Sequence, residues 1–186
     1  MTRESMNRRA FLESTGHAAV GVAVVASAGT TMLIAPDGAW AMTLQTLDGH
    51  AAKTLIGALR VIYPHDALGD QYYAEVVEAL DQDAQKDAAA AEMLKVGVAD
   101  LDRAMPVSFL ELSEGNRLQV LEAMESSDFF QKIRFKTVSV LYNNHRVWEA
   151  FGYEGASFDD GGYIDRGFDD LGWLPDPPEE ASPAKA

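Results

Sequence analysis

Apolar residues recur at helical spacing along most of this chain, from about residue 46 to residue 151. Five helices are predicted, over about 46–62, 71–83, 86–105 and 113–124, and from a cap at residues 126–128 to Phe151. Pro64 and Pro106 end two of them, because a residue that precedes proline avoids the helical conformation. No alternating run is long enough to predict a strand. The sequence therefore predicts an all-α fold, a small bundle of about five helices over residues 42–151.

The first 41 residues have the composition of an export signal. Their features are the pair Arg8 and Arg9, then Phe11 and Leu12, a weakly apolar run over 17–35, and finally Ala39-Trp40-Ala41. Paired arginines before a soft apolar run, with a small-x-small site after it, are typical of a twin-arginine signal. Residues 1–41 are thus predicted to be a signal peptide that the twin-arginine translocase reads, with cleavage after Ala41 and a periplasmic mature chain. The alternative is an uncleaved membrane helix over 18–35, which two glycines and three hydroxyl residues would make a poor span.

The chain carries a net charge of −14 and contains no cysteine. Three acidic residues match the three arginines of the signal, so the mature part keeps the whole net charge. Such an acidic surface repels phosphates, which argues against nucleic-acid binding and against docking to anionic lipid. Without cysteine the chain cannot form disulfides, ligate an iron–sulfur cluster through thiolates or attach a c-type haem. We therefore expect that this chain alone binds no cofactor.

Residues with catalytic or metal-binding chemistry are scattered. His50, His65 and His145 lack metal-ligand spacing and are interpreted as surface or capping histidines. No dinucleotide-binding, phosphate-loop or nucleophile-elbow motif is present, and the aspartates between 159 and 170 lack EF-hand spacing, which favours a solvated loop over a calcium site. The polar run 143–146 is a candidate for capping backbone carbonyls or for contacting a partner. The sequence thus predicts no catalytic, cofactor-binding or metal-binding residues.

Residues 152–178 combine six glycines with recurrent aromatic residues. The glycines argue against a regular helix or strand, and the aromatics are too many for a disordered linker. Ordered aromatics bury against the chain's own bundle or against a partner, and both alternatives are open. The predicted partner-binding residues are Tyr153, Phe158, Tyr163, Phe168, Trp173 and Leu174. Residues 179–186 are predicted to be a flexible tail.

Three features occur in order along nearly the whole chain. After the twin-arginine leader come Thr54-Leu55-Ile56 with Ile62-Tyr63-Pro64-His65-Asp66-Ala67-Leu68-Gly69, and then the tail with Gly152-Tyr153-Glu154-Gly155, Gly161-Gly162-Tyr163 and Gly167-Phe168-Asp169-Asp170-Leu171-Gly172-Trp173-Leu174-Pro175. This order resembles the gluconate 2-dehydrogenase subunit 3 family, the small subunits of bacterial FAD-dependent sugar, polyol and sugar-acid dehydrogenases. The sequence departs from the family at His65-Asp66, where a small or hydroxyl residue often follows the proline.

The resemblance implies a subunit without catalytic residues of its own. In this family the partner is a large FAD-containing catalytic subunit of the glucose–methanol–choline type, which lacks a leader and is exported on the small subunit's signal. A cytochrome c subunit or another carrier often takes the electrons, and membrane association would arise through the complex. The expectation is a non-catalytic periplasmic subunit that escorts and stabilises the flavoprotein. The alternatives are a stand-alone periplasmic enzyme and a solitary periplasmic helical binding or stress protein.

Overall fold

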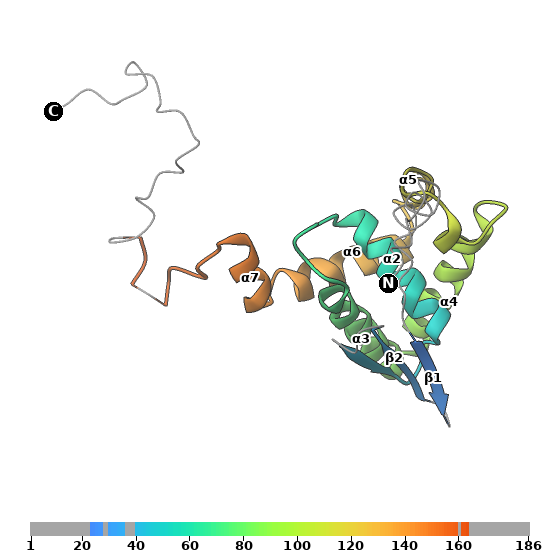
Figure 1. Ribbon diagram of the computed structural model, residues 1–186, viewed down its shortest axis with the longest axis horizontal. Helices are drawn as coiled ribbons and strands as arrows, with labels where there is room; N and C mark the ends of the chain where they lie inside the picture. Colours follow the sequence, from blue (N-terminus) through green and yellow to red (C-terminus); the bar gives the residue numbers. More distant parts are fainter. Residues whose placement is uncertain (1–22, 28–29, 36–39, 160, 164–186) are drawn as a thin grey trace, which may run out of the picture.

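The computed structural model describes residues 23–27, 30–35, 40–159 and 161–163 of the chain (Figure 1). This part is mostly helical, which confirms the predicted small helical bundle. The helices are α2 (Gly49–Ile62), α3 (Asp70–Lys86), α4 (Ala88–Arg103), the short 3-10 helix η1 (Phe109–Glu111), α5 (Glu114–Ala123), α6 (Asp128–Leu141) and α7 (His145–Phe151). Side chains of Asp48, Ser113 and Ser127 accept hydrogen bonds from backbone N–H groups at the starts of α2, α5 and α6, as expected for N-caps.

The prediction of one helix from residues 126–128 to Phe151 is wrong, because the structure has two helices there. α6 ends at Leu141, and α7 starts after Asn144, whose side chain accepts a hydrogen bond from the backbone N–H of Arg146. An asparagine side chain that binds nearby backbone starts a new helix more readily than it continues an old one. The polar run 143–146 therefore does supply a cap, but to a backbone N–H rather than to carbonyls.

A small sheet was not predicted. Strands β1 (Ala23–Ser27), β2 (Thr30–Ile34) and β3 (Ala41–Leu44) form an antiparallel sheet in that order, with Leu33 opposite Met42. The strands are four or five residues long, and the sequences of β1 and β2 lack strict alternation, so periodicity could not identify them. The helical bundle thus carries a sheet on one side of α2 and α3.

Part of this sheet lies within the predicted signal peptide. Leu33 of β2 and Met42 of β3 are both buried, so residues 30–35 pack as part of the body. Arg8, Arg9, Phe11, Leu12 and Ala39 lie outside the described residues. Cleavage after Ala41 stays a prediction, and in the folded chain it would require β2 to leave β3.

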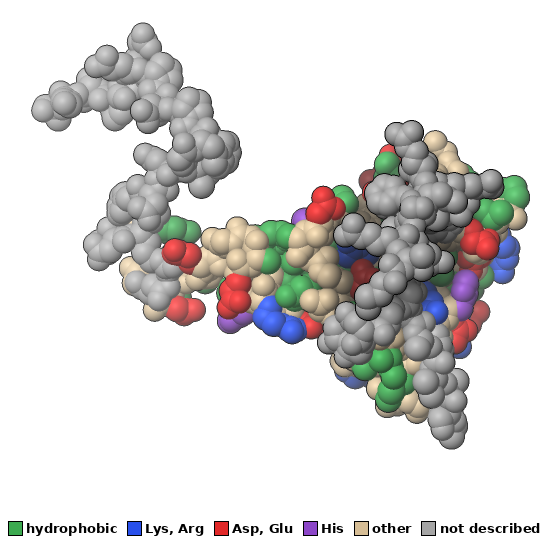
Figure 2. Space-filling view, viewed as in Figure 1, with side chains coloured by type: hydrophobic (Ala, Val, Ile, Leu, Met, Phe, Trp, Pro, Cys, Tyr) green, Lys and Arg blue, Asp and Glu red, His purple; other side chains and the backbone are tan. Residues whose placement is uncertain are grey.

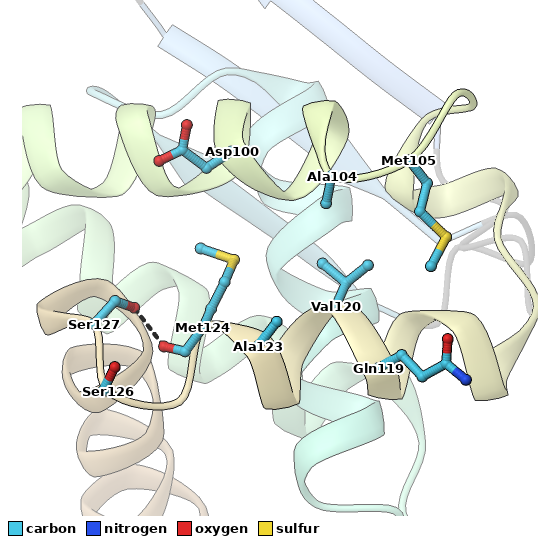
Figure 3. A pocket seen from close by; sticks show the side chains of 9 residues that line it. All are labelled: Asp100, Ala104, Met105, Gln119, Val120, Ala123, Met124, Ser126 and Ser127. Carbon is cyan, nitrogen blue, oxygen red and sulfur yellow. Dashed lines mark hydrogen bonds between the residues drawn. The ribbon is translucent and has the colours of Figure 1, made fainter.

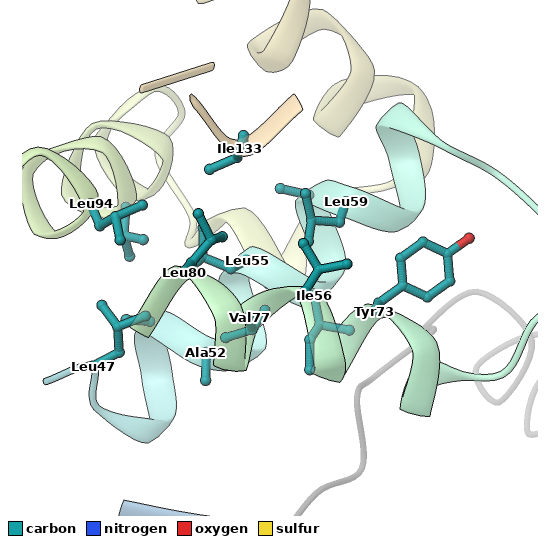
Figure 4. Close-up of a cluster of buried hydrophobic side chains, with 14 of the residues drawn as sticks. Leu47, Ala52, Leu55, Ile56, Leu59, Tyr73, Val77, Leu80, Leu94 and Ile133 are labelled. Carbon is teal, nitrogen blue, oxygen red and sulfur yellow. The ribbon is translucent and has the colours of Figure 1, made fainter. Parts of the chain in front are cut away.

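The core lies where α2 and α3 cross under α4 and α6 (Figure 4). Leu55, Ile56 and Leu59 of α2 and Leu80 of α3 belong to one cluster, and all four are fully buried. Leu94 of α4 and Ile133 of α6 close the cluster, whose other labelled members are Leu47, Ala52, Tyr73 and Val77. Burying each large aliphatic side chain contributes roughly 1.5–3 kcal/mol to folding, so this cluster fixes how the helices are arranged.

A buried carboxylate joins the sheet to the bundle. Asp81 of α3 is almost fully buried, and its oxygens accept hydrogen bonds from the backbone N–H groups of Gln45, Thr46 and Leu47 at 2.8–2.9 Å. The side chain of Gln85 donates a fourth bond at 2.8 Å. A buried carboxylate is tolerated when it is saturated in this way. The turn between β3 and α2 is therefore held on α3.

Candidate functional site

The chain leaves the bundle at its C-terminal end. Gly152 ends α7 in the left-handed conformation, with φ of 71°, a geometry that glycine adopts without strain. Residues 152–163, called the arm below, follow it without regular secondary structure among their described members. Figures 1 and 2 show α7 and the described part of the arm standing away from the helical body. The arm is therefore placed to reach another surface.

The arm's aromatic side chains differ in their surroundings. Tyr153 packs edge-on against Trp148 of α7, with ring centroids 5.2 Å apart, and Gly155 lies over the same indole. Phe158 and Tyr163 are 89% and 73% exposed. The sequence left open whether these aromatics pack on their own bundle or on a partner, and here only Tyr153 finds a partner ring within the described chain. Phe168, Trp173 and Leu174 lie outside the described residues.

An aromatic cluster forms the base of the arm. The Nε2 atom of His65 lies 2.5 Å from the Oη of Tyr142, and the His65 ring packs edge-on against Tyr142 and Phe151 with centroids 5.6 and 4.9 Å away. Tyr63 packs edge-on against Tyr142 at 5.8 Å. Burial, with the neighbouring tyrosines Tyr63 and Tyr73, raises the pKa of Tyr142, so its hydroxyl stays protonated at neutral pH and can donate. His65 is half-buried in this cluster. Its contact with Tyr142 joins the loop between α2 and α3 to the end of α6.

A polar contact holds the opposite side of α7. Glu75 of α3 accepts a hydrogen bond from the side chain of Asn144 at 2.7 Å and pairs with the guanidinium of Arg146. The same guanidinium lies over the ring of Tyr72, 5.5 Å from the ring centroid, within the limit of about 6 Å for a cation–π contact. The indole N–H of Trp148 donates to the carbonyl of Tyr142 at 2.6 Å. Aromatic contacts on one side and ionic contacts on the other thus attach α7 to the bundle.

The structure does not bring His50, His65 and His145 together. His50 pairs with Asp102, His65 belongs to the cluster at the arm's base, and His145 stacks on Trp148 with centroids 4.2 Å apart. Within the described ranges no group of three histidine, aspartate or glutamate side chains could hold a metal ion. Of the helices described, none has the length and apolar character needed to cross a membrane.

A groove lies between α4 and α5 (Figure 3). It has a volume of about 440 Å3 and is lined by Asp100, Ala104, Met105, Gln119, Val120, Ala123, Met124, Ser126 and Ser127. Met105, Val120 and Met124 point into it, and the hydroxyl of Ser127 is engaged with the carbonyl of Met124. Asp100 is the one ionisable side chain among these residues. The groove offers an apolar surface rather than paired acid–base groups.

A second pocket lies beside the predicted cleavage site. It has a volume of about 320 Å3, and its lining includes Trp40, Met42, Glu75, Glu78 and Arg146. The carboxylate of Glu78 accepts a hydrogen bond from the backbone N–H of Thr43 at 3.1 Å. Since Glu75 is held by α7, these carboxylates have structural partners and do not form an acid–base pair of the kind that general catalysis uses.

Sequence reasoning identified the arm but missed what supports it. Glu75 and Tyr142 were not singled out, because their roles depend on contacts with residues distant in the chain. Phe135 and Val138 of α6 were not singled out as exposed residues, although they are 70% and 41% exposed. The spacing of the buried residues Ile133, Thr137 and Leu141 could have identified both as lying off the core side.

Comparisons with known proteins identify no relative. The chain matches no protein-family model, no curated protein and no solved structure. The family resemblance in the sequence therefore remains an expectation.

Proposed function

We propose that this chain is a non-catalytic, exported accessory subunit that holds a large FAD-containing dehydrogenase subunit through its C-terminal arm. The observation that supports the proposal is the exposure of Phe158 and Tyr163 on a segment that projects from the bundle. Large aromatic side chains each bury about 150–250 Å2 in cores and interfaces, and they dominate the energy of interface contacts. Two such rings in water on one short segment are what a partner-binding segment requires.

The rest of the molecule is consistent with a supporting role. The arm is attached through α7 to His65 on one side and Glu75 on the other, which orients it before any partner arrives. A binding segment that is already oriented loses less conformational entropy when its partner binds. In this proposal FAD belongs to the partner, the chain alone binds no cofactor, and a cytochrome c subunit or another carrier takes the electrons. The twin-arginine signal would then export the folded flavoprotein together with this chain.

The proposal can be tested by removing the two exposed rings of the arm and, as a control, one exposed apolar side chain elsewhere. The full chain would carry an affinity tag in its native host, and the FAD-containing protein bound to it would be quantified by flavin absorbance and mass spectrometry. Phe158→Ala with Tyr163→Ala should remove most of that protein, whereas Leu118→Ala, on the exposed side of α5, should leave it bound. Equal flavoprotein recovery with all variants would rule out the arm as the binding segment.

The groove between α4 and α5 favours a second candidate function. A solitary periplasmic binding or stress protein would use an apolar site such as that lined by Met105, Val120 and Met124. The isolated full chain would then bind an apolar fluorescent ligand, and Ala123→Asp, which places a charge at an exposed position in the groove, would abolish that binding. Under the accessory-subunit proposal the chain is instead recovered with a flavoprotein, and Ala123→Asp leaves that recovery unchanged.

A further inference from the structure

Strand β3 contains the bond at which the sequence predicts cleavage. Ala41, the first residue of the strand, precedes the predicted cut, and Met42 follows it. β2 pairs antiparallel with β3, so that Leu33 lies opposite Met42. Beyond the ends of the two strands, the backbone N–H of Ala35 donates to the carbonyl of Trp40 at 2.9 Å. The predicted scissile bond therefore lies inside a paired strand.

The other edge of β3 is occupied by α3. The backbone N–H of Thr43 donates to the carboxylate of Glu78 at 3.1 Å, and the N–H of Gln45, just after the strand, donates to the carboxylate of Asp81 at 2.9 Å. An enzyme that binds an extended segment does so through backbone groups that are free to pair with it. While β2 lies on one edge and α3 on the other, β3 offers such an enzyme neither edge.

Side chains close to this bond are buried. Met42, which would begin the mature chain, is 2% exposed, and Leu33 opposite it is fully buried. Ala35, just after β2, is buried as well. A protease takes up residues on both sides of the bond that it cuts, so Met42 has to leave the core first. Because the burial of apolar side chains stabilises the folded chain, the form in which β2 is released is rarely populated.

β1 and β2 also take residues from the apolar part of the predicted signal. That part runs over residues 17–35, and the two strands occupy Ala23–Ser27 and Thr30–Ile34 of it. With both strands in the sheet, the apolar sequence before them ends at residue 22, whereas a membrane-spanning helix needs about 20 apolar residues. The strands and a membrane-spanning form of this segment therefore exclude each other. One segment thus has two alternative structures, and whatever binds one of them shifts the balance between them.

We infer that β2 shields the bond between Ala41 and Met42, so that a signal peptidase cuts this bond only after β2 has left β3. The inference rests on the export that the proposed function includes. In that proposal the chain crosses the membrane folded, so the sheet is already present when the chain meets the peptidase. Insertion of the signal into the membrane draws β2 away from β3 and opens the bond, whereas a folded chain free in solution keeps its signal.

The cut itself is a hydrolysis. Water adds across the peptide bond, which leaves a carboxylate on Ala41 and a free amino group on Met42. Residues 1–41 then leave with β1 and β2, and β3 stays attached to α3 through Glu78 and Asp81.

The first test locks β2 to β3 in the full-length chain. Met32 and Thr43 lie opposite each other and are exposed, and the N–H of Thr43 points to Glu78 rather than to β2. In such a non-hydrogen-bonded pair the Cα atoms lie about 4.5 Å apart, which a disulfide can bridge. The chain has no cysteine of its own, so Met32→Cys with Thr43→Cys forms a single disulfide.

The purified variant would be incubated with the signal peptidase of the native host in mild detergent, and intact mass would locate the cut. The oxidised form should stay uncut, whereas the reduced form should be cut at the rate of the matched control, Met32→Ser with Thr43→Ser. Vesicles of the host's lipids should accelerate cutting of the reduced form and leave the oxidised form uncut.

The second test weakens the pairing. Leu33→Ala removes a fully buried side chain from β2, so the released form should become more populated. Cutting of a segment that opens briefly follows the population of its open form, so Leu33→Ala should be cut at least about tenfold faster than the wild type. Leu118→Ala, at an exposed position of α5, should be cut at the wild-type rate. Circular dichroism would establish that both variants fold.

The outcomes separate this inference from the proposed function. An oxidised disulfide variant that is cut as fast as its reduced form would overturn the inference, as would a cysteine pair that does not oxidise or a folded Leu33→Ala that is cut no faster than the wild type. If Leu33→Ala does not fold, the disulfide comparison decides. If no form is cut after Ala41, even with vesicles, the inference fails together with the predicted cleavage site. The partner-binding role of the arm is tested separately by recovery of the flavoprotein, and none of these outcomes bears on it.

Discussion

The imidazole Nε2 of His65 and the hydroxyl of Tyr142 lie 2.5 Å apart, although 77 positions separate these residues in the chain. This contact joins the loop after Pro64 to the point where α6 ends and the chain turns toward the arm. It gives a structural role to His65, which lies where the sequence departs from the family that it resembles. It also means that the orientation of α7 depends on a side chain from the first helical hairpin.

Removing the Tyr142 hydroxyl should loosen α7 while the rest of the bundle stays intact. Tyr142→Phe keeps the ring contacts with Tyr63 and Phe151 but loses the hydrogen bond to His65, at a cost of about 1 kcal/mol. Hydrogen exchange should therefore accelerate at the amides of α7 and much less at those of α2. Unchanged exchange in α7 would show that the hydroxyl does not hold this helix.

Glycine 97 should not tolerate a side chain. A Cβ placed on Gly97 of α4 would lie 2.1 Å from the ring of Phe129, so Gly97→Ala forces α4 and α6 apart and should cost about 1–3 kcal/mol. Gly115 of α5 has open space around it, and Gly115→Ala should stabilise the helix by up to about 1 kcal/mol. Urea unfolding of the two variants measures both effects. A Gly97→Ala protein as stable as the wild type would contradict the close packing of α4 on α6.

Two buried threonines should respond differently to the same substitution. Thr54 is fully buried, and its hydroxyl has no hydrogen-bond partner among the described residues, so Thr54→Val should stabilise the protein by roughly 1 kcal/mol. Thr137 is equally buried, but its hydroxyl donates to the carbonyl of Ile133 at 2.7 Å, so Thr137→Val gains less or destabilises. Thermal unfolding of both variants provides the comparison, and a lower melting temperature for Thr54→Val than for Thr137→Val would refute it.

The ion pairs of Asp83 should make part of the stability depend on pH. The hydrogen bond from Lys136 is the main cause that lowers the pKa of the Asp83 carboxyl below 3.8, with Lys132 adding to it and burial opposing it. A lowered folded-state pKa gives stability that is present above the unfolded pKa and is lost as pH falls through the folded pKa. The wild type should thus exceed Asp83→Asn in unfolding free energy at about pH 6, and this excess should shrink below about pH 4. An excess that stays constant from pH 6 to pH 3 would mean that Asp83 does not titrate as its contacts require.

The sequence was sufficient for features that depend on nearby residues. Asp48, Ser113 and Ser127 start helices because each side chain binds the backbone N–H three positions on, and this local chemistry is visible in the sequence. The apolar stripes of α2 and α3 were visible for the same reason. These elements needed no knowledge of which helix packs on which.

Features that depend on distant residues were missed. β2 is a strand because Leu33 pairs with Met42, and its composition alone was compatible with the apolar middle of a signal. The break before α7 depends on Asn144, which binds Glu75 from 69 positions away. The arm's aromatics were identified, but the difference between Tyr153 and Phe158 arises from Trp148, which contacts only the former. Contacts between particular side chains and their partners, rather than composition, decided each of these outcomes.

The most direct test of the accessory-subunit proposal is the flavin content of the wild-type chain, purified through a tag from the periplasm of its native host. The accessory-subunit proposal predicts a large FAD-containing protein that co-purifies in a fixed ratio with this chain. A chain that is recovered alone and without flavin would contradict it.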